Sequence, residues 1–185
     1  MDKKKTVALY GGSFDPPHIG HVAIIQALAK LAFIDKVIVM PTFLNPFKEE
    51  FTAPADCRLQ WLQEIFAPYK NIQISDFEVK KKRKVPTIET IKALQEEYEK
   101  IYLVIGADNL ASLDKWYKFN ELSKLVTFIV VTRDNIEVPH NFQTLNIDID
   151  VSSSDLRKDL DISKLPKPCA TKIAHYYKEY NAKKN

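Results

Sequence analysis

Residues 11–21 read Gly-Gly-Ser-Phe-Asp-Pro-Pro-His-Ile-Gly-His and mark the passage from a buried strand to a helix. Three of the four glycines and two of the four histidines of this 185-residue chain lie in the stretch. At ordinary usage, roughly 7% glycine, a chain of this length would carry about 13. Each glycine is therefore expected to mark a place where a side chain is not tolerated.

The residues on either side define the local structure. Residues 7–10 are apolar, as in a buried strand, and residues 19–30 have helical character. A strand that ends in glycine before a helix N-terminus offers backbone N–H groups and the helix dipole to an anion. His18 and His21 are three residues apart and are expected to share one face of that helix. We interpret the segment as a binding site for a triphosphate.

A simpler interpretation is a tight connection between a strand and a helix, with two histidines at the surface. Pro16 and Pro17 favour the functional interpretation, because proline fixes its own backbone angle and removes N–H donors, so the loop is held in place. The glycine-bounded strand end and the histidine pair adjoin that fixed loop.

Composition narrows the class of protein. The chain is 45% hydrophobic and 28% charged, with a net charge of +3, which suits one globular domain over residues 1–185 that handles small anions. No apolar run approaches the roughly 18 residues of a membrane span. The basic residues 1–5 precede an apolar stretch too short for a signal peptide. Cys57 and Cys169 lie far apart and are expected to be reduced thiols in a cytoplasmic protein.

Apolar periodicity predicts an alternation of strands and helices. Predicted strands occupy residues 7–10, 36–40, 71–74, 101–105 and 126–131, and predicted helices occupy residues 19–30, 55–66 and 87–98. The nearly continuous apolar runs are typical of a parallel sheet that helices cover on both faces. We therefore expect an α/β fold, Rossmann-like and doubly wound, with a mainly parallel sheet. Its site should lie outside the carboxyl ends of the strands, where Gly11, Gly12 and Gly106 fall.

A second phosphate-type segment lies at residues 151–157. Ser152 or Ser153 can cap the helix that begins there, which leaves donors at its N-terminus. Arg157 follows about one helical turn later and can bind phosphate oxygens as a fork. The alternative is an ordinary serine-capped helix at the surface.

Residues 105–116 suggest a substrate side of the site. Asp108 comes just after a strand end and suits recognition of a ribose hydroxyl, although it could equally cap a helix that starts at Asn109. Trp116 is one of two tryptophans, and its indole suits stacking on an aromatic or cationic ring, or a place in the core.

These segments together resemble the bacterial nicotinate-nucleotide adenylyltransferases of the nucleotidyltransferase superfamily. Residues 11–21 are similar to the family's opening motif, residues 151–157 to its Ile-Ser-Ser-Thr-x-Ile-Arg motif, and residues 105–108 with Trp116 to its Gly-Ala-Asp…Trp segment. Members of the family form a dinucleotide from ATP and nicotinic acid mononucleotide and release pyrophosphate. The resemblance covers nearly the whole chain.

The resemblance implies a set of site residues. Catalysis would rest on His18, His21, Lys48 and Arg157. ATP would contact Gly11, Gly12, Ser13, Phe14, His18, His21, Gly106, Asp108, Ser152, Ser153 and Arg157, and the mononucleotide would contact Lys48, Thr87, Thr90, Asn109 and Trp116. Mg²⁺ is expected to accompany ATP on phosphate oxygens, without a protein metal site. Expected partners are these two small molecules, with no nucleic acid and no membrane.

Three segments depart from the family pattern. Residues 45–48 replace Pro-Pro-His-Lys with Asn-Pro-Phe-Lys, so Phe47 stands where the family has histidine. Residues 85–87 replace Ser-Tyr-Thr with Val-Pro-Thr and lose two hydroxyls. Residues 78–81 replace Glu-x-x-Arg with Glu-x-x-Lys, inside the basic run 80–84. That run is expected to be a solvated loop, or to attract anionic substrates over a distance.

Other functions remain open at this point. A different adenylyltransferase, with nicotinamide mononucleotide or phosphopantetheine as acceptor, would share both phosphate motifs. A non-catalytic ATP-binding regulator is a further alternative, although His18, His21 and Arg157 supply charges that a sensor does not need. Class I aminoacyl-tRNA synthetases share His-x-Gly-His, but 185 residues leave no room for a tRNA-binding domain.

Overall fold

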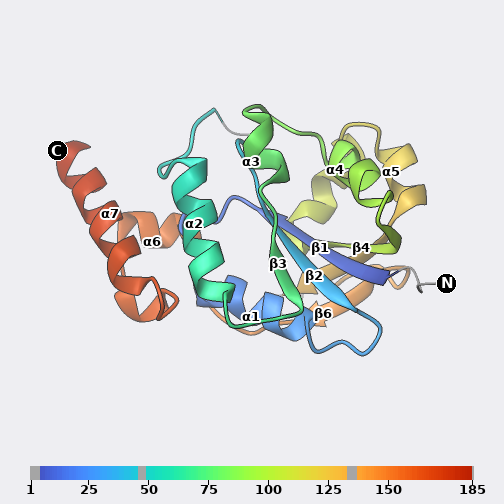
Figure 1. Cartoon of the computed structure of the whole chain (residues 1–185), viewed down its shortest axis with the longest axis horizontal. Coiled ribbons are helices and arrows are strands. Elements are labelled where there is room, and N and C mark those ends of the chain that lie inside the picture. The colour runs from blue at the N-terminus through green and yellow to red at the C-terminus, as the bar shows by residue number, and fades with distance from the viewer. Residues whose placement is uncertain (1–4, 46–48, 133–136, 185) are drawn as a thin grey trace.

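One parallel sheet organises the chain. The computed structural model describes residues 5–45, 49–132 and 137–184. Its strands are β1(Lys5–Gly12), β2(Lys36–Pro41), β3(Ile72–Ile74), β4(Tyr98–Gly106), β5(Thr127–Thr132) and β6(Gln143–Asn146). The spatial order is β3-β2-β1-β4-β5-β6, and every pair is parallel. This is the strand order of a doubly wound fold, so the predicted Rossmann-like α/β class is confirmed (Figure 1).

Helices cover both faces of this sheet. They are α1(Ile19–Leu28), α2(Ala55–Phe66), α3(Phe77–Lys81), α4(Thr87–Leu94), α5(Phe119–Leu125), α6(Ser153–Lys158) and α7(Ala170–Lys184), with 3₁₀ turns η1(Ala107–Lys115) and η2(Ile162–Lys164). Among the described residues, no helix is both long and apolar enough to cross a membrane.

Alternate residues along each central strand place their side chains in two separate hydrophobic cores, one on each face of the sheet. Ala8 and Val104 point to the core that α1, α2, α6 and α7 cover. Leu9 and Leu103 point to the core that α4, α5 and η1 cover. Because successive side chains on a strand point to opposite faces, a strand buried on both sides must be apolar throughout. The nearly continuous apolar runs in the sequence have this cause.

The structure differs from the sequence prediction around residue 95. The predicted helix 87–98 ends at Leu94, and Tyr98 already belongs to β4. Tyr98 is buried against the strand core, where an aromatic residue suits a strand better than a helix end. The sequence prediction also missed α3, α5, α7 and β6.

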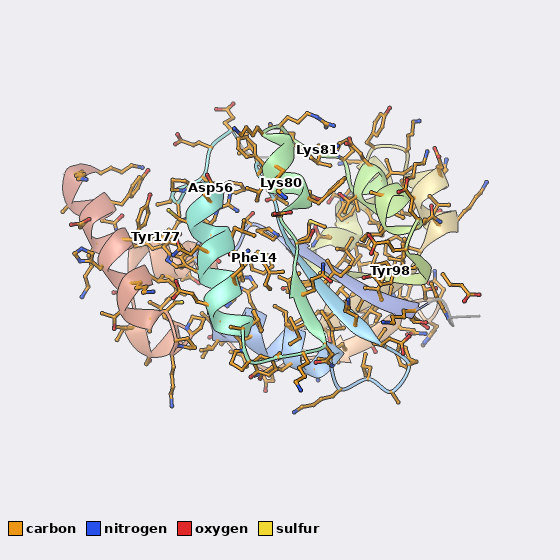
Figure 2. The ribbon with its side chains drawn as sticks, viewed as in Figure 1. Phe14, Asp56, Lys80, Lys81, Tyr98 and Tyr177 are labelled. Atoms are coloured by element: carbon orange, nitrogen blue, oxygen red, sulfur yellow. The ribbon has the colours of Figure 1, made fainter. Side chains whose placement is uncertain are left out.

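The C-terminal helix α7 is hydrogen-bonded to the glycine-rich loop, the segment 11–18 that leads from the end of β1 to α1. It lies beside α2 and α6, at the opposite end of the molecule from the N-terminus (Figure 1). Tyr177 lies between α7 and α2 (Figure 2), and its hydroxyl donates to the Asp15 carboxylate. Burial, followed by the charge of Asp15, raises the pKa of the Tyr177 phenol, which therefore stays protonated and remains a donor.

Removal of that hydroxyl should destabilise the protein. Tyr177→Phe leaves a buried carboxylate with one donor fewer, at a cost of about 1–3 kcal/mol in the free energy of unfolding. Urea denaturation measures this cost. The matched control is Tyr176→Phe, whose hydroxyl donates only to the Thr52 carbonyl at 3.1 Å and should cost less than about 1 kcal/mol. Equal costs for the two variants would contradict the buried Tyr177–Asp15 interaction.

Candidate active site

A cavity of about 800 Å³ opens at the carboxyl ends of the central strands. The ends of β1, β2 and β4 form its floor, and α1, α4, η1 and α6 begin around it. The predicted site residues that line it are Gly11, Gly12, Ser13, Phe14, His18, His21, Thr87, Gly106, Asp108, Asn109, Trp116, Ser152, Ser153 and Arg157. Such a volume is typical of sites for small molecules. The fold therefore brings most of the predicted residues to one place.

The two histidines form a reciprocal cap on α1. His18 is the N-cap, and its Nδ1 accepts from the His21 backbone N–H at 3.3 Å. His21 Nδ1 accepts from the His18 backbone N–H at 3.2 Å, and the rings stack with centroids 3.6 Å apart. The two rings therefore lie one on the other, and His18 precedes the helix instead of lying on its face as predicted. With both Nδ1 atoms accepting, each neutral ring carries its proton on Nε2 and can donate it to an anion.

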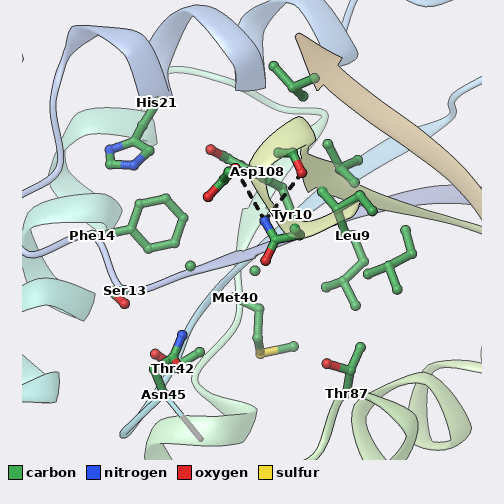
Figure 3. A pocket seen from close by; sticks show the side chains of 18 of the residues that line it. Leu9, Tyr10, Ser13, Phe14, His21, Met40, Thr42, Asn45, Thr87 and Asp108 are labelled. Carbon is green, nitrogen blue, oxygen red and sulfur yellow. Dashed lines mark hydrogen bonds between the residues drawn. The ribbon is translucent and has the colours of Figure 1, made fainter. Parts of the chain in front are cut away.

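Phe14 forms the wall beneath His21 (Figure 3). Its ring meets His21 edge-on at 4.9 Å, and its backbone is left-handed with φ 50°. A Cβ on Gly12 would come within 3.1 Å of this ring, so a side chain there would require the Phe14 ring to shift by a few tenths of an ångström. Gly11 differs, since a Cβ there would be 3.8 Å from the nearest atom, the Met40 carbonyl oxygen. The expectation that every glycine excludes a side chain is therefore wrong for Gly11.

Gly20 is where the two phosphate-type segments touch. A Cβ on Gly20 would lie 2.9 Å from Val151 Cγ1 and 3.1 Å from the His18 ring. Real Cβ contacts are essentially never closer than 3.0 Å. The glycine of His-x-Gly-His therefore lets the segment 151–157 approach the first turn of α1.

Hydrogen bonds complete the connection between the two segments. Ser152, not Ser153, caps α6, because its Oγ accepts from the Asp155 backbone N–H at 3.1 Å. Ser153 Oγ instead donates to the Pro16 carbonyl at 2.8 Å. Arg157 Nη1 donates to the Asp15 carbonyl at 2.5 Å, which holds the guanidinium at the cavity.

Asp108 faces His21 across the cavity (Figure 3). The turn η1 starts at Ala107 with Gly106 as its N-cap, so Asp108 is not the cap of a helix beginning at Asn109. Asn109 Nδ2 donates to the Gly106 carbonyl at 3.3 Å and approaches Asp108 Oδ1 at 3.5 Å. The Asp108 carboxylate is thereby positioned at the end of β4, as recognition of a hydroxyl requires.

The other end of the cavity lies at the N-terminus of α4. Thr87 is the first residue of α4 and lines the cavity, with Pro86 as the N-cap and no side-chain cap. Thr90 is only 1% exposed and does not line the cavity, because its Oγ1 donates to Glu78 Oε1 at 2.7 Å. The structure therefore does not bring Thr90 to the cavity surface, where the sequence predicts its contact with the mononucleotide. Thr90 acts on Glu78, which does line the cavity.

Trp116 closes this end of the cavity. Its indole Nε1 is buried and has no hydrogen-bond partner among the described residues. An unpaired buried donor is costly, so a ligand that places an acceptor at this N–H would be stabilised there.

Lys48 lies outside the described residues, and so does Phe47. In the basic run 80–84, Lys80 and Lys81 belong to α3 instead of a loop (Figure 2). Lys80 pairs with Asp76, while Lys81 and Arg83 approach Glu89. Within the described ranges, no group of three or more His, Cys, Asp or Glu residues is arranged to hold a metal ion.

Arg58 was not identified from the sequence, and it is hydrogen-bonded to the loop after β1 and to the segment between β2 and α2. The Arg58 guanidinium is 0% exposed and donates to the carbonyls of Ser13, Thr42, Phe43 and Ala53 at 2.6–3.1 Å. Burial lowers the pKa of Arg58, and the Asp15 charge partly opposes this effect. A lone arginine near the apolar stripe of the helix 55–66 was the available signal, since a buried arginine must have partners.

The chain is similar to proteins of one family. The cytidylyltransferase-like family model matches residues 9–159. A protein of Sulfurimonas denitrificans named "Probable nicotinate-nucleotide adenylyltransferase" is 58% identical over 96% of this chain and 98% of its own length. A protein of the same name from Campylobacter fetus is 45% identical over 96% of this chain and 99% of its own.

Solved structures agree on the fold. The nicotinic acid mononucleotide adenylyltransferase of Plasmodium falciparum, solved in complex with NaAD, superposes with a TM-score of 0.76. The two chains are 22% identical, and the match covers 96% of this chain and 98% of the other.

A methyl group at Gly20 should separate the two phosphate-type segments. Gly20→Ala should lower the free energy of unfolding by about 1–3 kcal/mol, the usual cost of overpacking. In a Val151→Ala background the cost should be smaller, because the nearest atom is then absent. Gly11→Ala is the control and should not destabilise. Strict additivity of Gly20→Ala and Val151→Ala in urea denaturation would contradict the contact.

Proposed function

The chain belongs to the cytidylyltransferase-like family and, within it, to the nicotinate-nucleotide adenylyltransferases, and we propose on this premise how its cavity works. The reaction is adenylyl transfer from ATP to nicotinic acid mononucleotide in NAD biosynthesis, which gives nicotinic acid adenine dinucleotide and pyrophosphate. The observation that carries the proposal is the single cavity with an anion-binding end at His18, His21 and Arg157 and a second end at the α4 N-terminus.

The ATP phosphates bind at the anion-binding end. His18 and His21 present Nε2–H donors there, since their Nδ1 atoms are engaged in the cap. Arg157 adds guanidinium donors from α6, Ser152 and Ser153 line the same end with their hydroxyl protons given to Asp155 and to the Pro16 carbonyl, and the backbone of residues 11–14 allows close approach. Asp108 accepts from a ribose hydroxyl on the opposite wall. These assignments rest on residue chemistry at the cavity and on the family's motifs.

The reaction is an in-line displacement at the α-phosphorus. A phosphate oxygen of the mononucleotide forms the new P–O bond while the bond between the α-phosphorus and the bridging oxygen breaks, and pyrophosphate leaves with that electron pair. The attacking phosphate is already an anion, so no protein nucleophile and no proton transfer is needed. The protein positions the reactants and stabilises the charge that develops on the leaving phosphates. His18, His21 and Arg157 supply this stabilisation, and Lys48 would neutralise charge between the two substrates.

The mononucleotide occupies the α4 end. The first N–H groups of a helix and the Thr87 hydroxyl offer donors to a nicotinate carboxylate. Trp116 stacks on the pyridine ring, and Asn109 contributes a polar contact from η1. A carboxamide in place of the carboxylate would leave its own N–H donors without acceptors among these groups. The proposal therefore includes a preference for the acid over the amide.

The ion Mg²⁺ enters as part of the MgATP substrate. Mg²⁺ in nucleotide sites keeps several waters and is bound by phosphates plus one or two carboxylates. Asp108 and Glu78 are the carboxylates among the described residues that line the cavity, and no group of three is arranged to hold a metal among those residues, which suits an ion carried mainly by the nucleotide. A cytoplasmic location is part of the same proposal, and the two free cysteines, Cys57 and Cys169, support it.

Pyrophosphate release with a panel of acceptors tests the function. The panel holds nicotinic acid mononucleotide, nicotinamide mononucleotide and phosphopantetheine, each with MgATP. The highest kcat/KM should belong to nicotinic acid mononucleotide. Turnover only with phosphopantetheine, or ATP binding without any turnover, would overturn the proposal.

Substitution of His18 can separate catalysis from helix capping. His18→Asn keeps a strong N-cap residue, so the free energy of unfolding should change by less than about 1 kcal/mol. It removes the imidazole donor, so kcat should fall by roughly 10²-fold or more. His21→Ala should lower kcat to a similar extent. Near-normal turnover in either variant would contradict the role of the histidine pair.

Arg157 should act on ATP more than on the acceptor. Lysine cannot reproduce the guanidinium fork, which here also donates to the Asp15 carbonyl and to Ser154 Oγ. Arg157→Lys should raise the KM for ATP roughly tenfold, the loss of one charge-assisted hydrogen bond. The KM for the mononucleotide should stay nearly unchanged. Steady-state kinetics with each substrate varied in turn measures both, and the reverse pattern would assign Arg157 to the acceptor.

A further inference from the structure

A buried carboxylate lies in the wall of the cavity at the α4 end. Glu78, in the first turn of α3, is only 7% exposed, yet it lines the cavity together with Pro86 and Thr87. Its Oε1 accepts from Thr90 Oγ1 at 2.7 Å, and Thr90 lies in the first turn of α4. Glu78 therefore lies next to the helix N-terminus that the proposed function gives to the substrate carboxylate.

The surroundings of Glu78 disfavour its negative charge. Burial, followed by the charge of Glu89, raises the pKa of Glu78 to about 7, and the hydrogen bond from Thr90 opposes this effect only in part. Glu89 is in turn paired with Arg83 at 2.6 Å and approached by Lys81. Near neutral pH, both the neutral and the ionised form of Glu78 are therefore populated.

Other charged residues lie on α3 and on the elements around it. They are Asp76 at the N-cap of α3, Lys80 and Lys81 on α3, Asp56, Arg58 and Glu64 on α2, Lys36 on β2, Glu89 and Lys92 on α4, and Lys82, Arg83 and Lys84 between α3 and α4. Arg58 is engaged with four backbone carbonyls, and Glu64 is bonded to Lys172. Glu89 is the charged group with the resolved effect on Glu78.

We propose that Glu78 is a specificity-determining residue that discriminates a pyridine carboxylate from a carboxamide according to its own protonation. Neutral Glu78 tolerates, and can donate to, a substrate carboxylate at the α4 N-terminus. Ionised Glu78 repels that carboxylate and accepts from the N–H of a carboxamide. This inference rests on the proposed function, because it concerns which mononucleotide the same cavity takes.

The ratio of two specificity constants isolates this effect. Nicotinic acid mononucleotide and nicotinamide mononucleotide carry the same phosphate and react with the same MgATP. Effects of pH on that phosphate, on ATP and on the anion-binding end of the cavity therefore cancel in the ratio of kcat/KM for acid over amide. Only titratable groups that interact differently with the nicotinate carboxylate and the nicotinamide carboxamide can make the ratio depend on pH.

The protonation state of Glu78 sets the direction in which the ratio of acid to amide changes with pH. Below pH 7 Glu78 is mostly neutral and the ratio is high, whereas above pH 7 Glu78 is mostly ionised and the ratio is low. Repulsion between the ionised Glu78 and the substrate carboxylate weakens binding of the acid only, so the ratio should fall roughly tenfold from pH 6 to pH 8.

Three variants test the assignment. Glu78→Gln is permanently neutral and keeps an acceptor for Thr90, so its ratio should stay high and flat from pH 6 to pH 8. Thr90→Val removes the bond that favours the carboxylate, so the transition should move to higher pH. Glu89→Gln alters a partly exposed carboxylate outside the cavity lining and should keep the transition in the ratio but move it to lower pH, because the charge of Glu89 raises the pKa of Glu78.

The outcomes are distinguishable. A wild-type ratio that does not change with pH, or a Glu78→Gln ratio that still falls with pH, would overturn the inference while leaving adenylyl transfer intact. Absence of turnover with both mononucleotides in the wild-type enzyme would instead overturn the proposed function. Circular dichroism and urea denaturation of each variant establish that the comparison is made between folded proteins.

Discussion

The buried carboxylate of Asp15 is the interaction on which the site depends. Its two oxygens accept from the backbone N–H groups of Thr52 and Ala53 at 2.9 Å and from the Tyr177 hydroxyl. Its own backbone carbonyl accepts from Arg157. One residue of the glycine-rich loop thus ties together the segment before α2, the helix α7 and the second phosphate-type segment. A carboxylate is tolerated at such a buried position because both of its oxygens accept hydrogen bonds.

Arg58 completes this support from the other side of the loop. Its guanidinium cannot lose its charge, so its burial is tolerable only with acceptors for its donors. Those acceptors are backbone carbonyls after β1 and β2, at the strand ends that form the cavity floor. The Arg58 guanidinium therefore fixes the chain just after β1 and β2. The opposite side of these strand ends faces the cavity and is left for an anionic ligand. Pre-organisation of this kind is what a direct displacement without a covalent enzyme intermediate requires.

Short-range patterns in the sequence predict much of this molecule. The apolar runs at residues 101–105 and 126–131 predict the parallel sheet, and the two phosphate-type motifs predict which strand ends and helix starts surround the cavity. Long-range contacts could not be predicted, because Ser153 meets Pro16 across 137 residues and Tyr177 meets Asp15 across 162. The stacked histidine cap and the burial of Thr90 were missed for another reason. Spacing gives the direction of a side chain along an ideal helix, whereas His18 precedes its helix and Thr90 faces a neighbouring one.

The departures at residues 85–87 bear on how the α4 end recognises a carboxylate. Val85 is buried, so it contributes to packing where the family has a serine hydroxyl. Pro86 supplies the N-cap backbone but has no N–H, so it cannot donate to a ligand. The donors that remain are the first helical N–H groups, whose direction the helix itself fixes, and the Thr87 hydroxyl. With fewer side-chain donors at this end, the charge on the neighbouring Glu78 carries more weight in the choice between acid and amide.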